Sequence, residues 1–150
     1  MWPFRKRHLP LESFPVNEDW AIAIGERDGK RTFIRIHLGA KPYAGHPGLP
    51  YCLSVIVPFL FPDEEGMPDE DEKEVLDDIE DSLREILGPA ARGFMVVIAT
   101  ANGAREFLLY TRDAEAANAA IAVTRKCSGE REIQSEILHD PKWVAYKHFT

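Results

Sequence analysis

The chain has 150 residues, of which 45% are apolar and 29% charged, and its net charge is −7 at neutral pH. This length and composition predict one soluble globular domain whose core needs no disulfide bond or metal ion. We assign an N-terminal extension to residues 1–15 and a single α+β domain to residues 16–150. Cys52 and Cys127 lie far apart and outside any C-x-x-C motif, which favours two reduced thiols over a redox or zinc site.

The first residues include basic side chains but not the apolar segment of a secretory signal peptide. No window approaches the roughly 18 apolar residues that a membrane-spanning helix requires. We therefore expect a cytoplasmic protein that does not interact with membranes. Its charge is unevenly spread, because residues 63–81 hold twelve acidic residues and one basic residue, Lys73. Such a surface repels phosphate backbones and disfavours nucleic-acid binding on that face.

Residues 20–38 predict a β-hairpin. Apolar and small residues alternate over 20–25, and the Asp-Gly pair in "ERDGK" supplies a tight turn. The return strand over 31–38 places Arg35 and His37 on one face and isoleucines on the other. The Gly- and Pro-rich stretch over 39–50 is typical of a loop.

A third strand is expected over 51–58 and is followed by an acidic helix. Asp69 is suited to cap this helix, and Glu72 completes a capping box. Apolar residues then recur every three or four positions, which is the period of a helix with one buried face. The Gly-Pro pair at 88–89 is expected to end the helix, with a C′ glycine and a proline that cannot continue it.

The second half repeats this alternation. The apolar run over 93–100 predicts a covered strand, and Asn-Gly leads into a second strand over 105–111. Asp113 is suited to cap an alanine-rich helix, and alternating residues over 131–138 predict a last strand.

From residue 51 the predicted order is strand, helix, strand, strand, helix, strand. This order is that of the ferredoxin-like split βαβ sandwich. Right-handed crossovers would place both helices on one face of a single antiparallel sheet. We therefore expect an α+β two-layer sandwich in which the N-terminal hairpin extends one edge, at a position that the pattern leaves open.

The chain ends in "DPKWVAYKHF", which is unusually aromatic for a terminus. Asp140 and Pro141 predict the start of a short helix with Trp143 and Tyr146 on one side. We expect Asp140, Trp143 and Tyr146 to form a structural latch that closes the core. The alternative is an exposed aromatic platform for a partner.

Two surfaces are candidate binding sites. The exposed side of the acidic helix carries Glu74, Asp77, Asp78 and Asp81, which could bind a protein with a basic surface; a merely solvated helix face is the simpler interpretation. A possible pocket would combine Arg35, His37 and Tyr110 if they share the open sheet face. A plain wet face is the simpler interpretation there too.

Known catalytic motifs are absent from the sequence. It contains no P-loop, G-x-G-x-x-G, G-x-S-x-G or H-E-x-x-H pattern. The acidic run does not follow the spacing of a calcium-binding loop, and a metal site of His37, Cys52 and His139 is conceivable only if the fold gathers them. We expect no catalytic residue, cofactor or metal site.

Several motifs together carry a resemblance to a known family. They are the "DPKWVAYKHF" ending, the "ANGAREFLLYTRD" hairpin, "DWAIAIGERDGKRTFIRIHL" and the acidic helix. With these, residues 16–150 resemble the family catalogued as domain of unknown function 695. That family is similar in layout to the regulator of ribonuclease E activity B, a protein-binding inhibitor. The family itself has no established activity, so the resemblance implies an α+β fold and supplies no catalytic residue.

These observations favour a non-enzymatic binding or regulatory domain that acts through the acidic helix. One alternative is a small-molecule enzyme with a polar site on the open sheet face. Another is a structural subunit of a larger assembly, which an unpaired apolar edge strand would indicate. The sequence does not specify the ligand, the partner or the oligomeric state.

Overall fold

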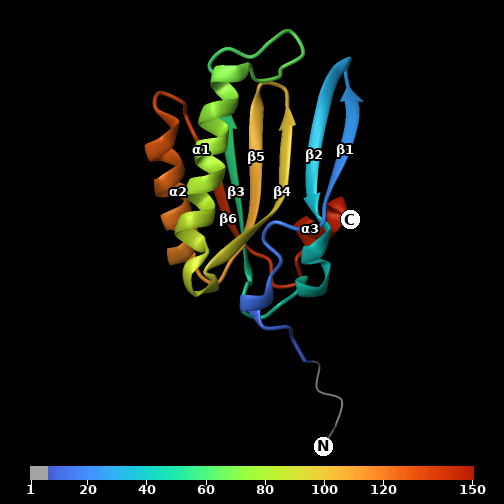
Figure 1. The fold of residues 1–150 in the computed structure, drawn as a ribbon, viewed down its shortest axis with the longest axis vertical. Coiled ribbons are helices and arrows are strands. Elements are labelled where there is room, and N and C mark those ends of the chain that lie inside the picture. Colours follow the sequence, from blue (N-terminus) through green and yellow to red (C-terminus); the bar gives the residue numbers. More distant parts are fainter. Residues whose placement is uncertain (1–6) are drawn as a thin grey trace, which may run out of the picture.

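The computed structural model describes residues 7–150, which form a mixed α+β fold around a six-stranded antiparallel open sheet (Figure 1). Residues 1–6 of the expected N-terminal extension lie outside the described part. The strand order is β1-β2-β4-β5-β3-β6. The strands are β1 (Trp20–Arg27), β2 (Lys30–His37), β3 (Tyr51–Pro58), β4 (Gly93–Ala101), β5 (Ala104–Thr111) and β6 (Gln134–His139). The helices are α1 (Glu70–Leu87), α2 (Ala114–Ser128) and α3 (Val144–Phe149), with 3-10 turns at Leu11–Ser13, Leu38–Tyr43 and Pro89–Ala91.

Both predicted tight hairpins are present. Asp28-Gly29 and Asn102-Gly103 each have two consecutive positive φ angles, the conformation that matches the twist of the flanking strands. The N-terminal hairpin joins the sheet through β2, which pairs antiparallel with β4. This pairing settles the position that the sequence left open, and it makes β1 one edge of the sheet.

The starts of both long helices and the end of α1 at Gly88 were predicted correctly. The carboxylates of Asp69 and Asp113 each accept a hydrogen bond of 2.8 Å from the backbone N–H three residues on. Gly88 keeps a right-handed conformation, and the left-handed residues are Ala90 and Ala91. A 3-10 turn at Pro89–Ala91 follows the helix before the chain reverses.

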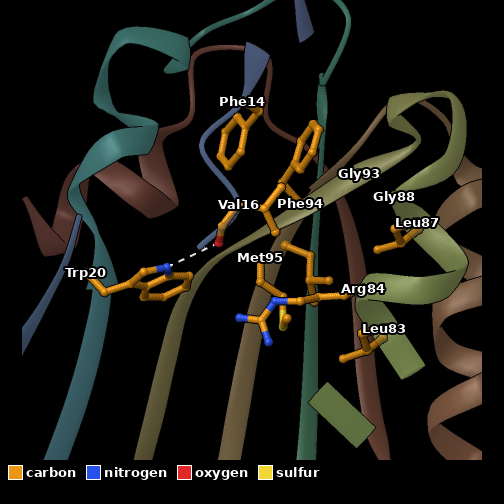
Figure 2. A pocket seen from close by; sticks show the side chains of 11 residues that line it. Phe14, Val16, Trp20, Leu83, Arg84, Leu87, Gly88, Gly93, Phe94 and Met95 are labelled. Carbon is orange, nitrogen blue, oxygen red and sulfur yellow. Dashed lines mark hydrogen bonds between the residues drawn. The ribbon is translucent and has the colours of Figure 1, made fainter. Parts of the chain in front are cut away.

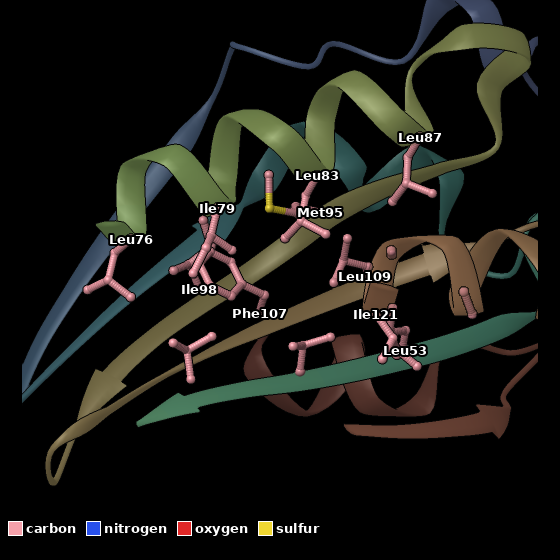
Figure 3. Packing of buried hydrophobic residues seen from close by; sticks show 14 of the residues in the cluster. Leu53, Leu76, Ile79, Leu83, Leu87, Met95, Ile98, Phe107, Leu109 and Ile121 are labelled. Atoms are coloured by element: carbon pink, nitrogen blue, oxygen red, sulfur yellow. The ribbon is translucent and has the colours of Figure 1, made fainter. Parts of the chain in front are cut away.

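The two long helices lie side by side on one face of the sheet (Figure 1). Their apolar residues pack on alternate residues of β3, β4 and β5 to form the first core (Figure 3). Its fully buried members include Leu53, Leu76, Ile79, Leu83, Phe107 and Leu109. Ala116, Ala117 and Ala120 of α2 are also buried there, and their small side chains let this helix approach the sheet closely.

The opposite face of the same strands carries a second core, and the C-terminal segment covers it. Trp143 is 0% exposed, and its ring lies 4.0 Å from that of Tyr110 in a stacked arrangement. The indole N–H of Trp143 donates to the carbonyl of Leu49 (2.9 Å). Tyr146 is also buried, and its hydroxyl donates to the carbonyl of His37 (2.5 Å). The terminal aromatics therefore join three distant parts of the chain.

Asp140 organises this segment, although the helix begins later than predicted. α3 starts at Val144, and the preceding Trp143 is left-handed, with φ of 58°. The two oxygens of Asp140 accept hydrogen bonds from the backbone N–H of Val144 (2.9 Å) and Ala145 (3.0 Å). One also accepts from the hydroxyl of Tyr110 (2.8 Å). Although partial burial opposes it, these hydrogen bonds lower the pKa of Asp140.

The role of the tail as a latch is testable at Trp143. Because the ring is fully buried, Trp143→Ala should lower the free energy of unfolding by about 3–5 kcal/mol, measured by urea denaturation. Val144→Ala is the matched control, since the Val144 side chain is 65% exposed. Its effect should stay within about 0.5 kcal/mol. Equal stability of the two variants would show that the tail does not close the core.

Candidate functional site

One cavity at the end of α1 is too small to hold an organic ligand. It lies between the end of α1 and the N-terminal segment, with Phe14, Trp20 and Arg84 around it (Figure 2). Its volume is about 30 Å³, which is room for roughly one or two water molecules. Its lining is largely apolar, so we interpret it as a packing defect between the two cores.

A larger depression lies between the N-terminal hairpin and the start of α1. We call it the hairpin groove. Its volume is about 480 Å³, within the range of roughly 300–1,000 Å³ that is typical of small-molecule sites. It is lined by Ile22, Arg31, Phe33, Arg35, Asp63, Glu65, Met67, Pro68, Lys73, Ile98, Thr100 and Arg105.

The groove forms because the two helices do not extend over the hairpin. They cover β3, β4 and β5, whereas β1 and β2 project beyond them (Figure 1). Ile22 and Ile24 of β1 are therefore 67% and 69% exposed. The groove floor is the uncovered continuation of the helix-side face of the sheet.

One wall is the loop between β3 and α1, which is held in a defined conformation. The Asp63 side chain accepts hydrogen bonds from the backbone N–H of Glu65 (2.8 Å) and Met67 (2.9 Å). Gly66 has φ of +80°, and a Cβ there would lie 2.9 Å from the backbone nitrogen of Gly103. Only glycine fits this contact with the β4–β5 turn. An ion pair between Arg31 and Glu65 (3.1 Å) joins this wall to the hairpin.

Arg35 on the groove floor is paired with α1. Its guanidinium donates to Glu80, which also accepts from Arg84 (2.6 Å). Burial favours the neutral form of Glu80, but the hydrogen bonds from both arginines outweigh it and lower the pKa of this carboxyl group. Glu80 is thus ionised, and both of its oxygens are already bound by arginine side chains.

Arg105, unlike Arg35, has no acidic ion-pair partner among the described residues. The Nε of Arg105 donates to the hydroxyl of Thr100 (2.9 Å). Burial, followed by the nearby charge of Arg35, lowers the pKa of its guanidinium. An arginine in this position remains charged at neutral pH, so the groove holds one partly desolvated positive charge.

The predicted acidic surface lies outside this groove floor. Glu74, Asp77, Asp78 and Asp81 are all exposed on α1. None of them forms an ion pair with another of the described residues. The four carboxylates therefore form a negative surface on the solvent side of the helix.

The predicted pocket of Arg35, His37 and Tyr110 does not exist. Arg35 is in register with Phe107 across β4, so it faces the helices. Tyr110 is three residues after Phe107 and therefore faces the opposite side, against Trp143. The prediction was wrong because it placed side chains on one face by strand proximity, without the register that decides the face.

His37 is fully buried at the end of β2, in a mostly aromatic environment. Its ring stacks on Trp20 at 4.6 Å and meets the edge of Phe14 at 5.2 Å. Its Nε2 lies 2.6 Å from the carbonyl of Pro15, and Nδ1 has no partner among the described residues. Burial outweighs the hydrogen bonds to backbone carbonyl groups and lowers the pKa of His37. His37 therefore fastens the N-terminal segment as a neutral ring.

The sequence alone did not identify Arg105 as a site residue. Its signal was present, because Arg105 lies two positions before Phe107 and so shares the inward face of β5. A charged residue at an inward position requires a partner or a function. The described residues contain no group of three or more potential metal ligands, and His37 and Cys52 lie on opposite faces of the sheet. Over the same range, no helix has the length and apolar character needed to cross a membrane.

The pKa of His37 predicts a specific pH dependence. The unfolded chain binds a proton near pH 6.5, and the folded chain binds it only at lower pH, so protonation favours unfolding. This contribution to stability is complete above about pH 6.5 and is lost as the pH falls through the lower folded-state value. In urea denaturation, His37→Gln should weaken the fall in stability below about pH 6.5. His139→Gln, at an exposed position, should leave the fall unchanged, and identical pH profiles for all three proteins would contradict the assignment.

Comparison with known proteins places the chain in a family. No curated protein and no solved structure shows significant similarity to it. The model of the family of unknown function (DUF695) matches residues 18–150, which include every strand and all three α-helices. This match covers nearly the whole chain and agrees with the resemblance of the hairpin and tail motifs. The chain therefore belongs to the family of unknown function DUF695.

Proposed function

We propose that this protein is a cytoplasmic, non-enzymatic binding domain that holds a small anionic ligand in the hairpin groove. The observation that carries the proposal is Arg105, a partly desolvated cation with no acidic partner among the described residues. The groove around it has the volume of a small-molecule site and walls that are already ordered.

A partly buried cation without an ion-pair partner carries a desolvation cost in the unliganded protein, and the charges of Glu80 and Asp77 offset this cost only in part. Removing a cation from water costs free energy that a nearby anion or hydrogen-bond acceptor must offset. Arg35 adds repulsion, because its positive charge lies close enough to lower the pKa of Arg105. A bound anion would remove both penalties, which is a physical reason for keeping an arginine there.

The electrostatics of the groove favour binding over catalysis. A general acid or base works best when its pKa lies near the working pH. Glu80 is the buried carboxylate behind the floor, and two arginines lower its pKa. Glu80 is therefore poorly suited to exchange a proton with a ligand, whereas it is well suited to position Arg35.

We also propose that the α+β fold is ferredoxin-like in its second half. The strands after residue 50 have the order β4-β5-β3-β6, and helices follow β3 and β5 in the chain. This order supports a split βαβ unit. In that arrangement the hairpin β1–β2 is an added edge, and the groove lies between the unit and its addition.

A comparison with the paired Arg131 tests the role of the partly buried Arg105. Arg105→Met keeps most of the side-chain volume and removes the uncompensated charge, so its Tm should equal or exceed that of the wild type. Arg131→Met removes the partner of Glu72 from an ion pair of 2.8 Å whose side chains are 8% and 4% exposed. That variant should lose about 3–5 kcal/mol of stability, because it leaves a buried carboxylate unpaired. A similar loss for Arg105→Met would make Arg105 a structural residue and remove the basis of the proposal.

A second candidate function is binding of a basic protein partner through the acidic face of α1. The observation that favours it is the exposure of Glu74, Asp77, Asp78 and Asp81 without ion-pair partners among the described residues. Exposed like charges steer an oppositely charged partner and make association sensitive to salt.

Charge reversal tests this second candidate. A variant with lysine at Glu74, Asp77, Asp78 and Asp81 should lose its partners in a pull-down from native cytosol, and high salt should release them from the wild type. The matched control carries lysine at Glu12, Glu18, Glu115 and Glu130, which are exposed elsewhere, so the net charge changes equally. Recovery of the same partners by all three proteins would count against the acidic surface.

A further inference from the structure

Building on the proposed function, we infer that the ligand of the hairpin groove is a monocarboxylate with an apolar body. Three features of the groove support this class. They are the part of Arg105 that is left open, the pairing of the other charges, and the apolar surface beside them.

The open part of Arg105 suits a planar group with two oxygens. Its Nε is bound to Thr100, which fixes the orientation of the guanidinium. The two terminal nitrogens make no hydrogen bond with the described residues. They are also not fully buried, unlike the unpartnered ring nitrogen of His37. They therefore remain open to the groove. Two N–H groups in one plane match a carboxylate, which accepts both.

The other cations that line the groove each have an acidic partner. Arg35 is paired with Glu80, Arg31 with Glu65 (3.1 Å) and Lys73 with Glu70 (3.3 Å). Arg105 is thus the one groove cation without an acidic partner among the described residues.

Acidic groups close to the groove oppose any further negative charge. Asp63 and Glu65 line it, and Asp77 is close enough to affect the pKa of Arg105. A dianionic phosphate would meet this repulsion with only one uncompensated cation, so a monoanion is favoured.

The remaining groove surface accounts for the apolar body. Ile22, Phe33, Met67, Pro68 and Ile98 line it together with the polar groups. Ile22 is 67% exposed in the structure, so covering it would remove apolar area from water. A ligand with an aromatic or branched aliphatic body next to its carboxylate would contact both kinds of surface.

A matched series of probes tests the inference. Phenylacetate, phenyl phosphate, 2-phenylethanol and acetate would each be titrated into the isotope-labelled protein, with amide chemical shifts followed by NMR. We expect phenylacetate to bind most tightly and to shift amides of β2, β5 and the loop over 62–68. Acetate lacks the apolar body and 2-phenylethanol lacks the charge, so both should bind more weakly.

Variants then assign the binding to Arg105. Arg105→Leu should weaken phenylacetate binding roughly 10- to 100-fold, the range of a charge-assisted hydrogen bond. Arg125→Leu removes an exposed arginine from α2 and should leave the affinity unchanged. The dispersion of the amide spectrum reports whether each variant is folded, and the probe series on the wild type remains decisive if Arg105→Leu is not.

The carboxylate could belong to a free acid or to the C-terminus of a peptide. A tetrapeptide ending in phenylalanine, compared with its C-terminal amide, distinguishes these sources. Tighter binding of the acid form than of phenylacetate would assign the groove to a chain terminus; weaker binding would assign it to a free acid. Either result supports the monocarboxylate class.

The failures are separable. Tighter binding of phenyl phosphate than of phenylacetate would overturn the monocarboxylate inference and leave an anion-binding groove. Equal binding of 2-phenylethanol, or no binding of any probe, would overturn both the inference and the proposed function.

Discussion

The rest of the structure depends on one constraint, which is that the central strands are apolar on both faces. In β5, Phe107 and Leu109 face the helices, whereas Leu108 and Tyr110 face the other way. A strand of this kind is stable only when both faces are covered. Helices α1 and α2 cover the first face, and the C-terminal segment with Phe14 and Tyr43 covers the second. The aromatic tail is therefore part of the sheet packing, although it comes last in the chain.

The hydrogen bonds of Asp140 show how the second layer is held. This carboxylate caps α3 and also accepts the hydroxyl proton of Tyr110, whose ring stacks on Trp143. Burial and the bond to Asp140 raise the pKa of Tyr110, so the hydroxyl stays protonated and remains a donor. The segment from Asp140 onward thus satisfies the free backbone N–H groups at the start of α3 and covers the Tyr110 face of β5.

The groove is a consequence of covering only part of a six-stranded sheet. Two helices span β3, β5 and β4 (Figure 1). The added hairpin leaves the groove beside the start of α1. Glu80 accepts hydrogen bonds from Arg35 of β2 and Arg84 of α1. This carboxylate therefore links α1 to β2 behind the groove floor. The chain is acidic overall, yet the groove is lined by the partly buried cation Arg105. Negative charge lies on the outer side of α1, and the positive charge of Arg105 lies in the groove.

Local pattern by itself determined the elements of this protein and their ends at Asp69, Asp113 and both hairpin turns. Those features depend on residues close in sequence, where period, capping and positive φ are decided. The start of α3 at Val144 was not predicted from the local pattern. Asp140 caps this helix across an intervening turn, and Asp140 is itself hydrogen-bonded to the distant Tyr110. The candidate site was decided only by the tertiary structure. Register placed Arg35 beside Glu80 and Tyr110 on the far face, and the packing of a distant loop against β4–β5 formed the groove around Arg105. These depend on which strands pair and how far the helices reach, and neither is encoded within a single stretch of the chain.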